Sequence, residues 1–311
     1  MIITRLNGGL GNQMFQYAAG LALAEARRTV LKLDVSWFRE DPTYEAHNRY
    51  ALSCLNVTEQ FATDEEIGRC RGTPFTRTER WLGKVAARLR LRQIAARYAE
   101  TGHWHPAPTF RFYPEFHALP DFSFIEGTFQ SEKFFAPIAP LVRLHFSLRY
   151  PAPPGVQAVA DRIRSGGPSA LVHFRRGDYA RNPTFKDAIG VLGPGYYERA
   201  LRHLRERHPD VTLYVFSDDI DTIAREFRTD LPHVFVREVA HWHSYDKIRL
   251  MSLCDHAIIS NSTFAWWGAW LNPRPDRTVI APEPWFVNSV HDTRDLVPER
   301  WTRLPGWIGQ T

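Results

Sequence analysis

The chain has 311 residues, of which 44% are hydrophobic and 23% charged, as in soluble globular proteins of one large or two medium domains. The formal net charge is +5, and arginine supplies nearly all of the basic residues. These arginines are scattered along the chain, whereas nucleic-acid binding favours a basic stripe interleaved with aromatic residues, so we expect no nucleic-acid partner. No run approaches the ~18 apolar residues that a membrane-spanning helix requires.

The three cysteines, Cys54, Cys70 and Cys254, are odd in number and lack metal-site spacing, which indicates a reducing compartment. The chain starts directly with a strand pattern and shows no charged and apolar leader. We therefore expect a cytoplasmic protein. The basic amphipathic stretch 80–97 is a candidate for peripheral contact with the inner face of a membrane.

The first 34 residues predict a Rossmann-type start. Residues 2–6 predict a strand, residues 7–13 a glycine-rich turn, and a helix follows from Asn12 or Gln13 to about residue 28. A second strand is expected over residues 29–34. Glycines at such a turn let backbone N–H groups approach a ligand, and the helix N-terminus favours an anion.

A dinucleotide site is the alternative interpretation of this turn. Gly9-x-Gly11 is followed by Met14 where that fingerprint requires a third small residue, although Asp34 stands where a ribose-binding acid would be. The adjacent amides of Asn12-Gln13 would instead suit a hydroxylated ligand. The match to a dinucleotide site is therefore partial.

The region between residues 40 and 150 is less regular. We expect helices at 64–70 and 77–98, a strand at 122–125 and a helix beginning near Lys133. The segment His103-Trp104-His105 resembles a sugar or metal site, but no acid or cysteine stands at ligand spacing beside it.

Pro151-Ala-Pro-Pro-Gly155 is the strongest linker signal in the chain. It predicts an acceptor-side domain at 1–150 and a nucleotide-sugar domain at 151–311, with a C-terminal tail that packs back on the first domain. Two domains joined by one such linker are expected to move relative to each other.

The second half alternates apolar strands with helices, which predicts a parallel, doubly wound α/β sheet. Ser244 is the expected N-cap of one of these helices. The predicted strands are 169–174, 211–216, 233–236, 256–259 and 278–281, and the predicted helices are 196–207, 219–227, 244–254 and 260–270.

Three polar clusters, 173–178, 217–219 and 260–263, follow three of these strands. The carboxyl ends of parallel strands share one edge of a sheet, so we expect the clusters to converge there. Arg175 could form fork-shaped hydrogen bonds to a diphosphate, which Ser262 or Thr263 and the N–H groups of the last helix could also contact. The convergence predicts a nucleotide-diphosphate site.

Each cluster also has an interpretation other than a nucleotide-diphosphate site. Arg175 or Arg176 could pair structurally with Asp178, and Ser262 and Thr263 could be ordinary helix caps. Asp219-x-Asp221 matches a short metal-binding pattern, but Arg175 already offers the positive charge that a metal would supply.

Four stretches together resemble bacterial α-1,2-fucosyltransferases of glycosyltransferase family 11. The third of them is also like a motif of α-1,6- and protein O-fucosyltransferases. The resemblance extends from residue 1 to about 287 and is poor between 40 and 115. The stretches are Gly8–Ala18, Gly127–Phe135, His173-x-Arg175-Arg176-x-Asp178 and Ser260–Leu271.

The resemblance implies a GT-B-like fold, with two Rossmann-type domains facing across a cleft, and an inverting enzyme that needs no metal or other cofactor. Its donor would be GDP-β-L-fucose, and its acceptor the 2-hydroxyl of a galactose-type unit in a surface glycan. Arg175 would neutralise the β-phosphate, and His173 would reach the ribose or diphosphate.

The resemblance also assigns roles to other residues. Asp218 would read guanine or ribose, Thr263 and Phe264 would close on the diphosphate, and Asn12 would face fucose and acceptor. The predicted catalytic residues are Arg175, Asn12 and His173. The predicted donor-binding residues are Arg175, Arg176, Asp178, Ser217, Asp218, Ser262, Thr263 and Phe264, and the acceptor-side residues are Gly11, Gln13 and Glu132.

Several alternatives stay open. The candidates for a general base are Glu126, Glu132, Asp34 and His47, and it is also open whether one is needed. Another nucleotide-sugar transferase of the same fold and a non-catalytic nucleotide-sugar or glycan-binding protein are the competing functions. The acceptor and the oligomeric state do not follow from the sequence.

Overall fold

The structure is a computed structural model, which describes residues 1–40, 49–71, 103–107, 110–177, 189–238, 242–287 and 291–307, together with positions 85 and 88. Some sequence-based predictions concern other residues. The helix at 77–98, the basic stretch 80–97, His47 and Asp178 lie outside the described residues, apart from those two positions.

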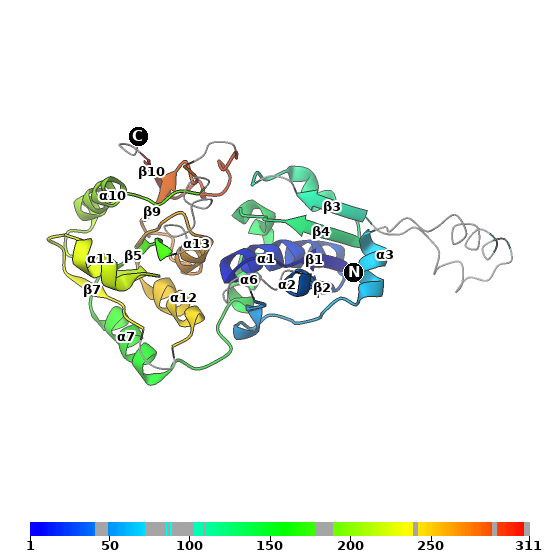
Figure 1. The fold of residues 1–311 in the computed structure, drawn as a ribbon, viewed down its shortest axis with the longest axis horizontal. Helices are drawn as coiled ribbons and strands as arrows, with labels where there is room; N and C mark the ends of the chain where they lie inside the picture. The colour runs from blue at the N-terminus through cyan, green and yellow to red at the C-terminus, as the bar shows by residue number, and fades with distance from the viewer. Residues whose placement is uncertain are drawn as a thin grey trace.

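Two parallel sheets lie side by side, one built by each half of the chain (Figure 1). The first has the order β2-β1-β4-β3. Its strands are β1 (Ile2–Arg5), β2 (Leu31–Asp34), β3 (His103–Ala107) and β4 (Ser123–Gly127). Its helices are α1 (Leu10–Arg27), α2 (Trp37–Glu40), α3 (Asp64–Arg71) and α6 (Ala139–His145), with short 3₁₀ turns between them.

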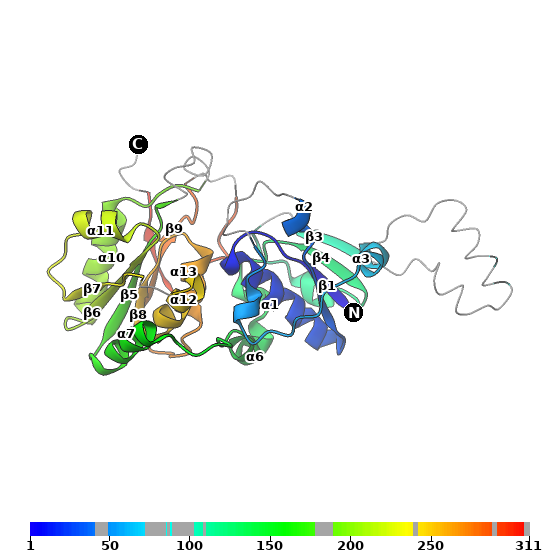
Figure 2. The same cartoon turned by 60° about the horizontal axis from the view of Figure 1, so that its bottom comes forward.

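The second sheet has the order β10-β9-β8-β5-β6-β7, with helices on both of its faces (Figure 2). Its strands are β5 (Ser169–Phe174), β6 (Thr212–Ser217), β7 (His233–Phe235), β8 (His256–Ile258), β9 (Val279–Glu283) and β10 (Thr302–Pro305). Its helices are α7 (Pro154–Ser165), α10 (Pro194–Arg207), α11 (Ile220–Glu226), α12 (Ser244–Leu253) and α13 (Thr263–Trp270). The α/β class predicted from the sequence is confirmed, and the pair of Rossmann-type sheets is GT-B-like.

Several local features differ from the sequence-based prediction. The helix α1 begins at Leu10, inside the expected glycine-rich turn, and the helix expected near Lys133 is replaced by two 3₁₀ turns that precede α6. His103–Ala107 pairs in parallel with β4 as an edge strand, and Thr302–Pro305 adds a strand beyond β9. Pro154 is not in a linker but opens α7, where its missing N–H costs nothing. The cap of α12 is His243, which forms a reciprocal capping box with Asp246, and not Ser244.

The two halves share one apolar core, in which α1 packs against α13. The Phe15 ring lies 4.6 Å from that of Trp266 and 4.7 Å from that of Trp267, while Phe135 stacks on Trp267 at 5.4 Å. All of these side chains are fully buried. At about 25 cal/mol per Å² of buried apolar surface, such large aromatic side chains make the contact between the halves strongly stabilising.

Each indole N–H of α13 binds a different segment of the chain. Trp267 donates to the Gly11 carbonyl at 2.9 Å, and Trp270 donates to a Glu132 carboxylate oxygen at 2.8 Å. Trp266 donates to the Leu296 carbonyl at 2.9 Å. The aromatic residues at 266–270 therefore fix α13 against both the N-terminal half and the C-terminal tail.

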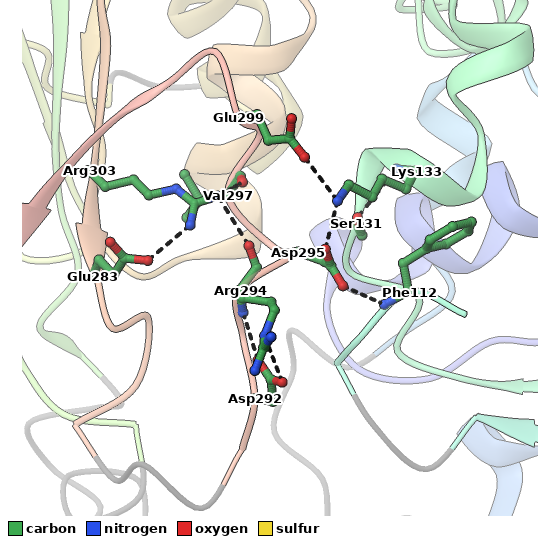
Figure 3. Close-up of polar contacts among 10 residues, drawn as sticks. All are labelled: Phe112, Ser131, Lys133, Glu283, Asp292, Arg294, Asp295, Val297, Glu299 and Arg303. Atoms are coloured by element: carbon green, nitrogen blue, oxygen red, sulfur yellow. Dashed lines mark hydrogen bonds and ion pairs between the residues drawn. The ribbon is translucent and has the colours of Figure 1, made fainter. Parts of the chain in front are cut away.

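The tail between β9 and β10 contacts the N-terminal half before it returns to the second sheet. Figure 3 shows Lys133 between two tail carboxylates, with its Nζ 2.8 Å from Asp295 Oδ1 and 3.1 Å from Glu299 Oε1. Asp295 also accepts the backbone N–H of Phe112 at 3.1 Å. These charged contacts add a second connection between the halves, beside the aromatic one.

None of the described helices combines the length and apolar character that crossing a membrane would require.

Candidate functional site

The candidate site lies where the two sheets change strand order. In the second sheet the chain continues from β5 to β6 on one side and from β8 to β9 on the other, so the switch point lies between β5 and β8. In the first sheet the corresponding point lies between β1 and β4. Ligands of open parallel sheets bind outside the carboxyl ends of strands at such points.

His173, near the end of β5, is 5% exposed, and its Nδ1 lies 2.8 Å from Ser260 Oγ in the loop after β8. This contact spans the switch point. Burial lowers the pKa of His173 to about 3, and the neighbouring cations Arg175 and Lys247 act in the same direction, against the opposing effect of Asp218. The imidazole is therefore neutral at physiological pH, and its Nε2 has no partner among the described residues.

Arg175 is held by Asp218, which follows β6, at 3.1 Å. The same carboxylate accepts the backbone N–H of Arg176 at 2.9 Å and of Gly177 at 3.0 Å. Burial raises the pKa of Asp218, but Arg175 and these two N–H groups outweigh it and leave the pKa below its ordinary value. A Cβ at position 177 would lie 2.7 Å from Asp218 Oδ2, so only glycine allows this approach. Asp218 thus fixes the loop that carries Arg175.

The remaining members of the first two clusters have local roles. Arg176 pairs with Glu226 at the end of α11, and Ser217 Oγ accepts the Asp219 N–H at 2.9 Å. Asp219 is the N-cap of α11. Asp221, the second acid of the Asp-x-Asp pattern, pairs with Arg237. Within the described residues, no three His, Cys, Asp or Glu side chains lie close enough together to hold a metal ion.

The third cluster meets the N-terminal half at Asn12. Asn12 Oδ1 accepts the Thr263 hydroxyl at 3.0 Å and the Gln130 amide at 3.2 Å, so the Asn12 NH₂ group is oriented and has no partner in the described structure. Ser262 begins α13, but its hydroxyl makes no cap bond. Phe264 is partly buried against the shared core. Asn12, Ser262 and Thr263 therefore come together, and two of them keep polar groups for a ligand.

The structure gives packing roles to the three acceptor-side residues. Gly11 supplies the close contact with α13. Gln13 is fully buried, and its NH₂ group donates both hydrogens to the carbonyls of Gly8 and Arg49 at 2.8 Å, which leaves no donor for a ligand. Glu132 accepts from Trp270 and pairs with Arg300 at the C-terminal end of α13. It is therefore not brought to Asn12.

Of the other candidate bases, His47 lies outside the described residues, Glu126 is paired, and Asp34 uses one carboxylate oxygen while its Oδ2 is buried without a hydrogen-bond partner. Glu126 pairs with Arg5 at 2.9 Å and with Arg71 at 3.2 Å. Asp34 is fully buried and accepts the Ser36 N–H at 2.8 Å.

Sequence reasoning did not single out Gln130 and Lys247. The Gln130 side chain is 5% exposed and orients Asn12, while its own Oε1 is buried without a hydrogen bond. Phe129, just before it, has a φ of 48°, a strained conformation of the kind found at functional sites. Lys247 Nζ reaches the Ser217 carbonyl at 3.3 Å and Glu238 at 2.5 Å, which adds a cation to this edge. The motif Gly127–Phe135 was the available signal for Gln130, whereas nothing local indicated Lys247.

Comparison with known proteins shows which class of protein this chain belongs to. The model of the family described as Glycosyl transferase family 11 matches residues 160–310. A protein of Escherichia coli named alpha-1,2-colitosyltransferase is 30% identical over 98% of this chain and 99% of its own length. Another Escherichia coli protein, O-antigen biosynthesis glycosyltransferase WbnK, is 29% identical over 96% and 99%. Galactoside 2-alpha-L-fucosyltransferase SEC1 of Bos taurus is 33% identical over 48% of this chain and 40% of that protein.

The α/β fold and these relatives define the protein as a glycosyltransferase. The chain belongs to glycosyltransferase family 11.

Proposed function

We propose that the protein is an inverting transferase that moves L-fucose from GDP-β-L-fucose to the 2-hydroxyl of a galactose-type acceptor in a surface glycan. The main support is the arrangement of side chains at the switch points of the two sheets. Arg175, fixed by Asp218, lies with neutral His173 beside the N-terminus of α13, and the Asn12 amide contacts that helix from the other half.

Arg175 has the chemistry to neutralise the charge that develops on the leaving diphosphate. A guanidinium held by a carboxylate needs little reorganisation during the reaction, and such preorganised charge stabilisation is a large term in catalysis. The Ser262 hydroxyl and the first N–H groups of α13 would bind other oxygens of the diphosphate. With these groups in place the reaction would need no metal ion.

Asn12 comes from the half opposite to Arg175 and would contact the sugar or the acceptor. Its carbonyl oxygen is occupied by Thr263 and Gln130, so the amide can act there only as a hydrogen-bond donor. A donor of fixed direction suits a sugar hydroxyl or ring oxygen. This assignment makes Gln130 a positioning residue for Asn12.

The relatives support the 2-hydroxyl linkage, because the names alpha-1,2-colitosyltransferase and galactoside 2-alpha-L-fucosyltransferase both specify it. They also provide a second candidate donor sugar. Colitose is fucose without its 3-hydroxyl, and the relative that bears its name covers nearly the whole chain. Transfer of colitose by the same site is therefore the alternative.

The test is GDP release from the GDP-activated forms of fucose, colitose and mannose, each with a panel of galactose-terminated acceptors and with EDTA in parallel. The proposal expects acceptor-dependent release from GDP-fucose that EDTA does not change, and a 2-linked product by NMR. GDP release from GDP-colitose but not from GDP-fucose would identify colitose, in place of fucose, as the sugar that is transferred. Release abolished by EDTA would contradict the metal-free mechanism, and GDP binding without release in any combination would contradict the enzymatic role.

A further inference from the structure

A second candidate site lies at the C-terminal end of α13, whereas the candidate donor site lies at its N-terminus. A pocket of about 260 Å³ opens there. Its charged lining residues are all arginines, and two tryptophans form part of its apolar wall. These six residues are Arg143, Arg274, Arg277, Arg300, Trp270 and Trp301.

Two of the four arginines have acidic partners that lie outside the lining. Arg300 pairs with Glu132, and Arg274 pairs with Asp255 and Asp276. No carboxylate belongs to the pocket wall among the described residues. The charged groups of the wall itself are therefore all positive, and three carboxylates lie behind two of them.

Arg143 and Arg277 have no acidic partner within the described residues. The Arg143 guanidinium lies 4.0 Å above the Trp270 ring and donates to the Trp270 carbonyl at 3.4 Å. Arg277 donates to the carbonyls of Ala269 and Asn272. These contacts cap the end of α13, as basic side chains often do, but the partial negative charge of a helix C-terminus offsets only part of two full positive charges.

The two guanidinium groups are also incompletely hydrogen-bonded. Arg143 Nε and both Nε and Nη2 of Arg277 are buried without a partner. Burial lowers the pKa of Arg277 to about 10; Cys254 and Asp255 oppose this shift, and the neighbouring charges of Arg300 and Arg274 add to it. Since a buried charge without an ionic partner is costly, helix capping alone does not account for both Arg143 and Arg277 at one pocket. An anion would offset this cost.

We propose that this pocket binds a phosphate group. A phosphate monoester carries nearly two negative charges and three terminal oxygens, which matches several guanidinium forks better than a single carboxylate does. The group could belong to a soluble phosphorylated compound or to an anionic lipid headgroup. The proposal stands apart from the proposed reaction, because none of its residues belongs to the site around Arg175.

Calorimetric titration with inorganic phosphate, at constant ionic strength, tests the proposal. The full chain is first saturated with GDP, so that the candidate donor site is occupied. Saturable binding of one phosphate is expected, and Arg143→Gln should weaken it about tenfold, as the loss of one charge-assisted contact predicts. Arg164→Gln, which removes an exposed arginine of α7, should leave it unchanged.

The Arg175→Ala protein separates this proposal from the proposed function. It should keep phosphate binding at the pocket even where it has lost GDP-sugar binding. Arg277→Gln removes part of the α13 cap, so the folding of this variant is checked by thermal unfolding. Arg143→Lys is a milder variant, which should bind phosphate with an affinity between those of the wild type and Arg143→Gln. Absence of saturable binding, or equal affinity in the wild type and Arg143→Gln, would overturn the proposal.

Vesicle sedimentation identifies the source of the phosphate group. Binding to vesicles that contain phosphatidic acid, whose headgroup is a phosphate monoester, but not to phosphatidylcholine vesicles, displaced by inorganic phosphate and weakened by Arg143→Gln, would support a lipid headgroup. Phosphate binding without vesicle binding would support a soluble phosphorylated ligand. Vesicle binding that Arg143→Gln leaves unchanged would count against a lipid role for the pocket.

Discussion

Asp218 illustrates how the role of a single residue depends on its contacts. The family resemblance led to the expectation that it reads guanine or ribose. In the structure its carboxylate already accepts from Arg175 and from the N–H groups of Arg176 and Gly177. Arg175 is held by Asp218, while Asp178, for which the sequence suggested such a pairing, lies outside the described residues. A positioning role for Asp218 follows from these contacts.

Asp218→Asn should therefore lower kcat more than it raises KM for the donor. Loss of the charge beside Arg175 is expected to cost a factor of about 10–100 in kcat, since hydrogen bonds to charged groups contribute about 1.5–3 kcal/mol. Steady-state kinetics measures both constants, and Asp221→Asn, which removes an exposed acid paired with Arg237, is the matched control. A raised KM with unchanged kcat would instead identify Asp218 as a nucleotide contact.

Arg175→Ala should remove the main charge that stabilises the leaving diphosphate. We expect a loss of ~100- to 1000-fold in turnover, as for other preorganised electrostatic groups. Acceptor-dependent GDP release measures the effect, with Arg164→Ala as the control for the loss of one arginine. Turnover within a factor of about two of the wild type would contradict the role given to Arg175.

Buried His173 makes stability depend on pH. Its pKa is lowered in the folded state, whereas in the unfolded chain it lies near 6.5, so only the unfolded chain takes up this proton as the pH falls. The contribution of the neutral ring is complete above about pH 6.5 and is lost progressively below it, by about 2 kcal/mol at pH 5.

Urea unfolding at pH 7.5 and pH 5 checks this expectation. The loss of unfolding free energy between the two values should be about 2 kcal/mol smaller in His173→Asn than in the wild type. His291→Asn, a change at an exposed histidine, should behave as the wild type does. An equal loss in all three proteins would mean that His173 takes up its proton normally in the folded state.

At the scale of elements, the approach of α1 to α13 depends on Gly11. A Cβ there would lie 2.7 Å from the backbone of Thr263 and Phe264. Because backbone atoms of a packed helix cannot move aside easily, Gly11→Ala should push the two helices apart. We expect about 1–3 kcal/mol of destabilisation and lower activity.

Chemical denaturation and the GDP-release assay measure these effects. Gly195→Ala in α10 is the matched control, because its Cβ would meet only the end of the Arg199 side chain, at 3.2 Å. It should fold normally, with stability equal to or slightly above that of the wild type. If Gly11→Ala behaved in the same way, α1 and α13 would not be in the tight contact described here.

Apolar runs between turn signals predicted most strands of both sheets, because a strand buried on two faces leaves a strong local pattern. The edge strands β3 and β10 were missed, since an edge strand need not be apolar throughout and both contain proline. The α12 cap was placed one residue late. Ser244 is the commoner cap residue, but the reciprocal bonds of His243 and Asp246 decide the position.

At the scale of the whole molecule, the Pro-rich segment suggested two domains that move about a linker. The structure shows a continuous aromatic core across both halves, and large apolar interfaces oppose independent domain motion. The polar clusters of the site could be predicted because strand ends of a parallel sheet converge. The pairing of Asn12 with Thr263, 251 positions apart, could not, because no local pattern specifies contacts between the two sheets.

The halves should accordingly unfold together. Calorimetry of the full chain is expected to show one cooperative transition, because neither half keeps its core when Phe15 separates from Trp266 and Trp267. Trp267→Leu should lower the midpoint of that single transition. Two separate transitions, or a stable half after proteolysis near residue 151, would contradict this view.

The anchoring of α13 by three indole groups also constrains the engineering of hybrid enzymes. An exchange of N-terminal halves between relatives, made to change the acceptor, would place a new α1 against an unchanged α13. The partners of Trp267 and Trp270, the Gly11 carbonyl and Glu132, would then come from a different parent. A crossover at the proline-rich segment takes α1 and α13 from different parents. A working hybrid therefore needs the α13 residues that face the N-terminal half to come from the same parent as that half.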